Sequence, residues 1–375
     1  MAGNKMTNME VKRKNRNRIY RYMQRSGVVS NPDIAYELKL SLPTVTQNTK
    51  ELIEMGLLKE NGELESTGGR KAKALSVEKN AKLAAGIDLT KNHIGLLLTN
   101  LAGDILKYER MKFPFSRNDA YFSGVNDQLE AFLGECGIEK EKVLGIGISV
   151  PGIVDLEKKE ITNSHALGIE KLPFEEIEQY FALPCVFLND ANAGAYAEGI
   201  RLNAEKRFFY LSLSNTVGGA VFDRGTLIYG SGFRCGEVGH MTIVPNGEMC
   251  YCGKDGCLDS YCNAKRLSEL ADGKLEDFFM GLKQKKELFA REWERYASYL
   301  AIAVNNIHMV LDCDIILGGY VGSYLSDYIG QIRGEVSKRN TFAEDGMFIR
   351  ECNYKTGAAA LGAALYVIEA FVEQI

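Results

Sequence analysis

The sequence lacks long apolar stretches and a leader-like beginning. No run of about 18 apolar residues occurs in its 375 residues, which argues against a membrane-spanning helix. The N-terminal segment MAGNKMTNMEVKRKNRNR has no apolar core of the kind that secretory signal peptides carry. With 46% hydrophobic and 25% charged residues, the composition is not that of a disordered chain either. We therefore expect a globular protein of two or three domains that stays in the cytoplasm, with no membrane partner.

Histidine is scarce, and the cysteines do not suggest disulfide pairing. There are four histidines and nine cysteines, an odd number. In a reducing compartment, clustered thiols favour metal binding over disulfides. One histidine is in register with three cysteines in GEVGHMTIVPNGEMCYCGKDGCLD, as His240-x9-Cys250-x-Cys252-x4-Cys257. The segment predicts a metal site, and free thiols buried beside a loop histidine are the alternative.

Basic residues outnumber acidic residues only in the first segment of the chain, and most of the chain has no such excess of positive charge. Residues 1–80 hold 15 Lys and Arg against 9 Asp and Glu, whereas residues 81–375 hold 30 against 40. The first segment is therefore basic by six charges and the rest acidic by ten, within a total of −4. This split favours an anionic partner for the first segment, because the acidic remainder does not attract that partner.

The basic segment is typical of a DNA-binding module with three helices. VKRKNRNRIYRYMQRSG has a helical pattern, and SNPDIAYELKLS predicts a second helix capped by Asn31, with Pro32 at its first position. Ser41 is expected to cap a third helix, LPTVTQNTKELIEMG, that ends at Gly56. The outward face of this helix is polar and nearly uncharged at its start, which suits hydrogen bonding to base edges in the major groove. We predict DNA contacts from Ser41, Pro43, Thr44, Gln47, Asn48 and Lys50.

Two short strand patterns after the third helix predict a wing. LLKENGELES and RKAKALSV flank the turn STGGRK, which carries the predicted DNA contacts Arg70 and Lys71. The glycines of this turn allow close backbone approach to a phosphate, and Arg70 suits a narrow minor groove. The order of elements predicts a winged helix-turn-helix over residues 1–80. A helical packing or protein-binding module is the alternative.

From about Leu83 the pattern changes to alternating strands and helices. AAGIDLTKNHIGLLLTNLAGDILKYERMKF predicts three strands joined by short turns, and FYLSLSNTVGGAVFDRGTLIYG predicts more strands. Helical patterns such as LNDANAGAYAEGIRL fall between them. The second three-strand opening repeats the first, which indicates two related α/β halves with a cleft between them. Clefts of that kind hold small ligands.

Five motifs of the α/β part resemble those of the ROK family, which groups bacterial sugar kinases with transcriptional repressors. They are GISVPGIVD, LNDANAGAYAE, GEVGHMTI, CYCGKDGCLDSY and GAAALGAAL. The resemblance covers about residues 81–375, and the head, with LSLPTVTQNTKELIEMGLL and STGGRK, resembles the winged helix-turn-helix of the repressor branch. It implies an α/β fold in which the winged helix-turn-helix precedes a two-lobed, actin-like (ribonuclease H-like) domain. Lobe one is expected at about residues 81–190 plus the C-terminal helix, and lobe two at about 191–355.

The resemblance also implies a metal site and a sugar site. A structural zinc ion would be held by His240, Cys250, Cys252 and Cys257, which form a closed shell of one nitrogen and three sulfurs. The second ring nitrogen of the histidine would remain available to the ligand. The family's sugar contacts correspond to Asn189, Asp190, Glu237 and His240, and Asp259 stands where the family has a glutamate. Carboxylates and amides suit a polyol, because they accept or donate hydrogen bonds to hydroxyls.

The phosphate-binding loops of the family's kinases are altered in this sequence. The first, Asp-x-Gly-Gly-Thr, reads Asp88-Leu89-Thr90-Lys91-Asn92, and the second, Gly-Thr-Gly-x-Gly, reads Ser214-Asn215-Thr216-Val217-Gly218-Gly219. The third keeps Gly318-Gly319 but continues with Tyr320. Phosphoryl transfer depends on positioned phosphates, so we expect Asp190, the position of the catalytic base, to be vestigial and the chain not to be an enzyme.

These observations together predict a sugar-responsive transcriptional repressor. Its expected partners are operator DNA and a monosaccharide or sugar-phosphate effector, and the expected assembly is a homodimer or homotetramer. The alternative is an ATP-dependent sugar kinase with an accessory DNA-binding head.

Overall fold

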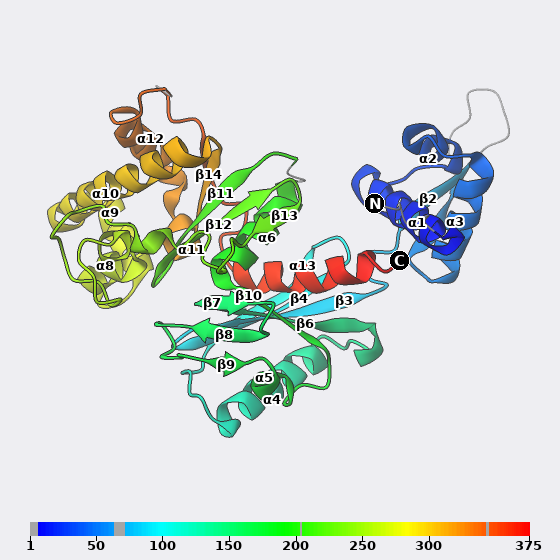
Figure 1. The fold of residues 1–375 in the computed structure, drawn as a ribbon, viewed down its shortest axis with the longest axis horizontal. Helices are drawn as coiled ribbons and strands as arrows, with labels where there is room; N and C mark the ends of the chain where they lie inside the picture. Colours follow the sequence, from blue (N-terminus) through cyan, green and yellow to red (C-terminus); the bar gives the residue numbers. More distant parts are fainter. Residues whose placement is uncertain (1–6, 64–71, 203–204, 343–344) are drawn as a thin grey trace.

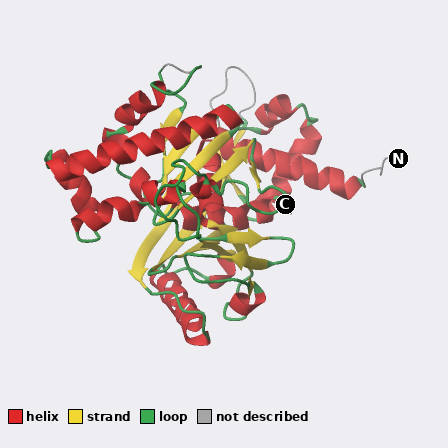
Figure 2. Cartoon of the chain, turned by 60° about the vertical axis from the view of Figure 1, so that its left-hand side comes forward, coloured by secondary structure: helices red, strands yellow, loops and turns green. Residues whose placement is uncertain are grey.

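The computed structural model describes residues 7–63, 72–202, 205–342 and 345–375. A small helical body at the N-terminus is followed by two α/β lobes, each built on a five-stranded sheet (Figure 1). In Figure 2 the strands of the two lobes form separate groups, with helices packed around them. None of the helices within these ranges is long and apolar enough to cross a lipid bilayer.

The N-terminal body contains three helices and an antiparallel hairpin. Its elements are α1 (Asn8–Ser26), α2 (Asn31–Leu38), α3 (Leu42–Glu54), β1 (Leu58–Glu63) and β2 (Lys73–Val77). One apolar side of each helix is buried in a common core, which includes Ile19, Tyr20, Met23, Ile34, Val45 and Leu52. This is the predicted order of three helices followed by a strand pair.

The helix caps of this body follow from short polar side chains. Ser41 caps α3 by accepting a hydrogen bond from the Thr44 N–H, as predicted. The cap of α2 is Ser30 rather than Asn31, because the Ser30 hydroxyl reaches the Asp33 N–H and the Asp33 carboxylate bonds back to the Ser30 N–H. Asn31 is instead the first helical residue, and its amide oxygen accepts a hydrogen bond from Thr49 on α3 at 3.0 Å.

The first lobe is a mixed sheet in the order β10-β6-β3-β4-β5. Antiparallel strands β3 (Leu83–Leu89), β4 (His93–Asn100) and β5 (Ile105–Lys112) come first, and β6 (Val143–Val150) and β10 (Cys185–Asn189) continue the sheet parallel to β3. The connections add further elements, namely α4 (Asp119–Glu135), η1 (Lys140–Lys142), β7 (Ile153–Asp155), β8 (Glu160–Asn163), β9 (Leu172–Pro173) and α5 (Glu175–Glu178). Strands β7 to β9 form a small separate sheet.

The second lobe repeats this topology, in the order β13-β12-β11-β14-β15. Strands β11 (Phe208–Leu213), β12 (Val217–Asp223) and β13 (Thr226–Ile228) are antiparallel, and β14 (Asp314–Gly318) and β15 (Ile349–Glu351) are added in parallel. Between and after the strands lie η2 (Val238–His240), α7 (Leu258–Cys262), α8 (Ala264–Ser268), η3 (Glu269–Ala271), α9 (Leu275–Lys283), α10 (Glu287–Leu311), α11 (Gly319–Gly322), η4 (Leu325–Asp327) and α12 (Ile329–Ser337). The repeat confirms the prediction of two related α/β halves.

Two helices lie side by side where the lobes meet, α6 (Asp190–Leu202) and α13 (Ala358–Val372). α13 covers the face of the first sheet opposite to α4, because alternate residues of β3 pack against each helix. Glycines permit the close approach: a Cβ on Gly362 would lie 1.7 Å from the Ala193 carbonyl oxygen, and one on Gly147 would lie 2.0 Å from that of Ala363. Figure 1 shows α13 in red, running along the sheet toward the N-terminal body.

The end of α13 contacts α1 of the N-terminal body. The Asn17 amide donates a hydrogen bond to the Val372 carbonyl oxygen, and the Arg21 guanidinium forms a two-bond ion pair with the Glu369 carboxylate. Gln24 donates to the Leu101 carbonyl oxygen at 3.0 Å. One helix thus connects α6, the first sheet and the N-terminal body.

Candidate functional sites

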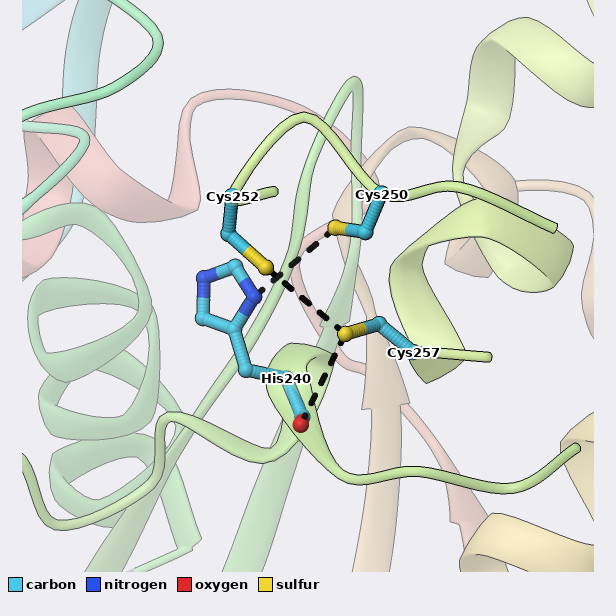
Figure 3. A group of neighbouring side chains, drawn as sticks. All are labelled: His240, Cys250, Cys252 and Cys257. Atoms are coloured by element: carbon cyan, nitrogen blue, oxygen red, sulfur yellow. Dashed lines mark hydrogen bonds between the residues drawn. The ribbon is translucent and has the colours of Figure 1, made fainter. Parts of the chain in front are cut away.

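His240, Cys250, Cys252 and Cys257 converge into one cluster. Their ligand atoms all lie within 4.8 Å of one another, with 3.9 Å between Cys250 Sγ and His240 Nδ1 and 3.8 Å between Cys252 Sγ and Cys257 Sγ (Figure 3). Four ligands around a tetrahedral zinc ion are expected roughly 3.5–3.8 Å apart. The donor set and its spacing therefore fit a closed tetrahedral metal site.

The local backbone explains why these four residues meet. His240 ends the short helix η2, and Cys257 immediately precedes α7. Thr242 bridges to Cys257 and Met249 bridges to Asp255, so the intervening chain folds back on itself. Gly256 has a φ of +78°, and a Cβ there would lie 1.8 Å from the Val244 carbonyl oxygen, so the turn requires glycine.

A cavity of about 420 Å³ opens beside this cluster, between the lobes. The residues that line it from the first lobe and the start of α6 include Gly152, Thr162, Asn163, His165, Asn189 and Asp190. Those that line it from the second lobe include Thr216, Val217, Arg234, Glu237, His240 and Tyr251. The size and the dominance of polar side chains suit a small polar ligand.

Asn189 and Asp190 lie at the junction of β10 and α6. The Asn189 amide donates to the Gly152 carbonyl oxygen at 2.9 Å, and its oxygen accepts from the Asn192 N–H at 3.0 Å. Asp190 follows it at the first position of α6. Burial raises the pKa of Asp190 to about 7, and the nearby carboxyls of Asp88 and Glu237 contribute to the shift.

Glu237 and His240 enter the cavity from the other side. Burial raises the pKa of Glu237, while His240, His165 and Arg234 act in the opposite direction. The His240 Nδ1 is the ring nitrogen 3.9 Å from Cys250 Sγ, so Nε2 is the nitrogen left for a ligand. The cavity therefore combines two carboxyls with an imidazole held by the cysteine cluster.

Asp259 does not lie in the cavity, contrary to the prediction. It is 1% exposed, its Oδ2 accepts a hydrogen bond from the Val217 N–H at 2.5 Å, and its Oδ1 lies 3.3 Å from the Asn263 amide nitrogen. The Asp259 carboxylate is thus occupied by a hydrogen bond from the backbone at the start of β12. Asp259 therefore positions Val217, which lines the cavity.

Several cavity residues were not predicted from the sequence, namely His165, Arg234, Tyr251, Thr162, Asn163 and Thr216. The rings of His165, His240 and Tyr251 pack together, with centroids 5.5–6.3 Å apart. Local signals did exist, since Tyr251 stands between two of the clustered cysteines and Arg234 lies three residues before Glu237. His165 belongs to a loop far away in sequence, and only the fold brings it to the site.

Residues from the second and third predicted phosphate-loop positions come together, and Asp88 of the first acts electrostatically on Tyr320. Ser149 donates a hydrogen bond to Asp88 at 2.6 Å, and burial raises the pKa of Asp88. The Tyr320 N–H donates to Ser214 Oγ at 3.4 Å. Arg110 on β5 donates to the Tyr320 hydroxyl at 3.2 Å, and its guanidinium lies 5.1 Å from the centre of the tyrosine ring. Arg110 and Tyr320 therefore link the two lobes at this end of the cleft.

The predicted DNA-reading face is formed by α3. Ser41, Pro43, Gln47 and Lys50 are exposed, and Thr44 is half-buried with its hydroxyl 2.7 Å from that of Ser41. Asn48 is a correction: it is only 2% exposed and donates to the Thr44 carbonyl oxygen, so its side chain belongs to the packed side of α3. Arg70 and Lys71 of the predicted wing lie outside the described residues.

Comparisons with known proteins cover nearly the whole chain. Residues 84–370 match the ROK family, and residues 12–59 match a winged helix-turn-helix DNA-binding family. A putative xylose repressor of Caldicellulosiruptor sp. strain Rt8B.4 is 28% identical over 91% of this chain and 92% of the relative. A xylose repressor of Bacillus spizizenii strain W23 is 28% identical over 97% of each chain.

A solved structure shares the fold of the whole chain. The crystal structure of a ROK family transcriptional regulator, a homologue of the Escherichia coli MLC protein, matches with a TM-score of 0.77 at 20% identity, over 97% of each chain. The family match alone spans more than three quarters of the sequence. The chain therefore belongs to the ROK family and carries an N-terminal winged helix-turn-helix.

Proposed function

We propose that this protein is a sugar-responsive transcriptional repressor of carbohydrate-utilisation genes. The observation that carries the proposal is that α6, which begins at the cavity, packs against α13, and that α13 contacts α1, which packs against α3 with its exposed polar face. The repressor names of full-length relatives support it. The sugar is proposed to bind through Asn189, Asp190, Glu237 and His240, and operator DNA through Ser41, Pro43, Thr44, Gln47 and Lys50 of α3 and Arg70 and Lys71 of the wing.

The cysteine cluster is proposed to hold a structural zinc ion. Three thiolates and one imidazole leave no open coordination position, so the ion supplies structural rigidity rather than Lewis-acid chemistry. Fixing Nδ1 of His240 in the cluster also fixes the direction of Nε2, which donates a hydrogen bond to the sugar.

A sugar kinase is the alternative function, and the geometry disfavours it. The turn after Asp88 has no glycine, and the Thr90 hydroxyl donates to the His93 carbonyl oxygen within it. Tyr320 stands at the third glycine-rich position, where burial raises its pKa to about 12 and Arg110 holds its hydroxyl. Phosphoryl transfer needs unobstructed backbone N–H groups around the phosphates, so we propose that the chain lacks kinase activity.

We propose that sugar binding changes the position of the DNA-binding body through α13. Asp190 begins α6, α6 packs against α13, and α13 contacts Asn17 and Arg21 of α1. In a homodimer or homotetramer, a shift along this path alters the separation of two α3 helices on the operator. A sugar that favours one arrangement by about 2–3 kcal/mol changes operator affinity by about 30- to 150-fold.

The assignment of α3 and the wing predicts two different mutant behaviours. Gln47→Ala is expected to lower discrimination between preferred and altered duplexes, by about 1–3 kcal/mol at one base pair, because a base-edge contact is lost. Lys71→Ala is expected to weaken binding to all duplexes and to reduce the salt slope by about one unit. The measurement is fluorescence anisotropy on duplexes selected by the full chain from a random pool, with Gln284→Ala on the exposed end of α9 as the control. Identical behaviour of the two variants would contradict the assignment.

A sugar panel tests the function as a whole. With the full zinc-loaded chain on a selected duplex, at least one sugar is expected to change the dissociation constant by about 30- to 150-fold. ADP measured in parallel with ATP present is expected to stay at the level of an Asp190→Asn variant. Operator affinity that no sugar alters would contradict the proposal, and sugar-dependent ADP formation at about 1–1000 per second would favour the kinase.

A further inference from the structure

One cation of the cavity is left without a partner. Among the described residues, the exposed side chain of Arg234 makes no hydrogen bond, ion pair or contact with an aromatic ring, although it lines the cavity and influences Glu237 electrostatically. No ion pair joins it to Glu237, three residues further along the chain. A guanidinium that faces a ligand cavity and has all its donors free is available to the ligand.

The backbone holds Arg234 in place. The residue before it, Phe233, has a φ of +55°, which is unusual for a side chain other than glycine. The Cys235 N–H donates to the Tyr229 carbonyl oxygen at 3.1 Å, and the Glu237 N–H donates to that of Arg234 at 3.3 Å. Gly236 has a φ of +95°, and a Cβ there would lie 2.1 Å from the Gly219 carbonyl oxygen on β12. The Cys235–Tyr229 hydrogen bond therefore closes the loop that carries Arg234, and Gly236 packs the end of this loop against β12.

A neutral sugar does not need this residue. Its hydroxyls are served by the carboxyls of Asp190 and Glu237 as acceptors and by Nε2 of His240 as a donor. A guanidinium has five donors and no acceptor, and its planar fork matches a carboxylate or a phosphate. His165 lines the same cavity from the first lobe and offers a further hydrogen-bonding group there. The surplus donors point to an acceptor-rich, negatively charged group on the ligand.

We infer that the effector is a monosaccharide that carries one acidic group, a carboxylate or a phosphate, and that Arg234 is the residue that selects it. This inference rests on the proposed sugar-binding function of the same cavity. The hydroxyls lie toward Asp190 and Asn189, and the acidic group lies toward Arg234. Binding of one ligand by Arg234 from the second lobe and Asn189 from the first holds the lobes together.

Isothermal titration calorimetry on the full zinc-loaded chain tests the inference. The ligands are glucose, galactose and mannose, each beside its uronate and its 6-phosphate, so that the two acidic groups are separated. At least one acidic sugar is expected to bind tenfold or more tightly than its neutral parent. Arg234→Ala is expected to reduce that ratio to near one while any binding of the parent changes less than twofold. Arg224→Ala, at an exposed arginine in the β12–β13 turn that pairs with Asp223, is the control and is expected to keep the ratio.

The outcomes separate this inference from the proposed function. Neutral sugars that bind more tightly than their acidic derivatives, or an unchanged ratio in Arg234→Ala, overturn the inference and leave a sugar-binding repressor. Absence of binding by every sugar to the folded, zinc-loaded chain overturns both. A Tm in Arg234→Ala within about 2 °C of the wild type establishes that the variant is folded, because a surface substitution costs little stability.

Discussion

Cys257→Ser is expected to lose the bound zinc and to lower the free energy of unfolding by about 4 kcal/mol or more. Cys257 is 1% exposed, and its sulfur lies 3.8 Å from that of Cys252. The variant therefore keeps only three ligands in a buried site, and no other group replaces the missing thiolate. For a chain of this size, a loss of about 4 kcal/mol corresponds to a fall in Tm of roughly 5 °C. Because His240 then loses its fixed orientation, sugar affinity is expected to fall as well.

Metal content by mass spectrometry and thermal unfolding on the same preparations measure this effect. Cys136→Ser is the matched control, since Cys136 is a half-buried thiol at the end of α4, outside the cluster. The control is expected to keep one zinc ion per chain and to change Tm by no more than about 1 °C. A full equivalent of zinc in Cys257→Ser, or an unchanged Tm, would show that Cys257 is not a ligand.

Asp190→Asn is expected to weaken sugar binding by about 10- to 150-fold, because a charged hydrogen-bond acceptor contributes about 1.5–3 kcal/mol. The wild-type affinity is expected to rise with pH up to the pKa of about 7 and then level off, since the carboxylate is the accepting form. Below that pKa the sugar affinity of the wild type changes by nearly tenfold per pH unit, and the Asp190→Asn variant lacks this part of the pH dependence. Calorimetric titrations at pH 5.5, 6.5, 7.5 and 8.5 measure both effects.

The same substitution is expected to stabilise the ligand-free protein at high pH. A carboxyl whose pKa is raised on folding holds its proton in the folded state between pH 4 and about 7, while the unfolded chain has released it. Stability is therefore lost as the pH rises through this window, and Asp190→Asn removes that loss. Asp277→Asn, at an exposed carboxyl in the first turn of α9, is expected to change neither affinity nor stability measurably. An Asp190→Asn variant with wild-type affinity would exclude Asp190 from the sugar site.

Local patterns predicted the elements and the metal cluster well. Hairpins, capped helices and the two three-strand sets depend on residues close in sequence, so they can be read from alternation and turn residues. The four clustered ligands lie within 18 residues, between His240 and Cys257, in one folded-back segment. The α2 cap was misassigned by one position, because Ser30 and Asn31 are both good capping residues and only the backbone geometry distinguishes them.

The direction of individual side chains was harder to predict. Asn48 and Asp259 are polar, and their residue types suit DNA or sugar contacts, yet both satisfy backbone groups of the protein itself. A buried carboxylate or amide needs such partners, and a nearby unpaired N–H or carbonyl can recruit it before any ligand does. Which polar side chains remain free for a ligand is thus decided by the complete hydrogen-bond arrangement, to which distant segments contribute.

The amino-acid sequence by itself determined the basic DNA-binding module, the duplicated α/β plan, the cluster of one histidine and three cysteines, and the carboxyls of the cavity. These depend on periodicity, charge and short spacings. Only the tertiary structure decided that His165 reaches the cavity beside His240, that Arg110 and Tyr320 link the lobes, and that α13 joins the cavity to α1. Those contacts join residues separated by about 70 to 350 positions, and their formation depends on how whole elements pack rather than on local preference.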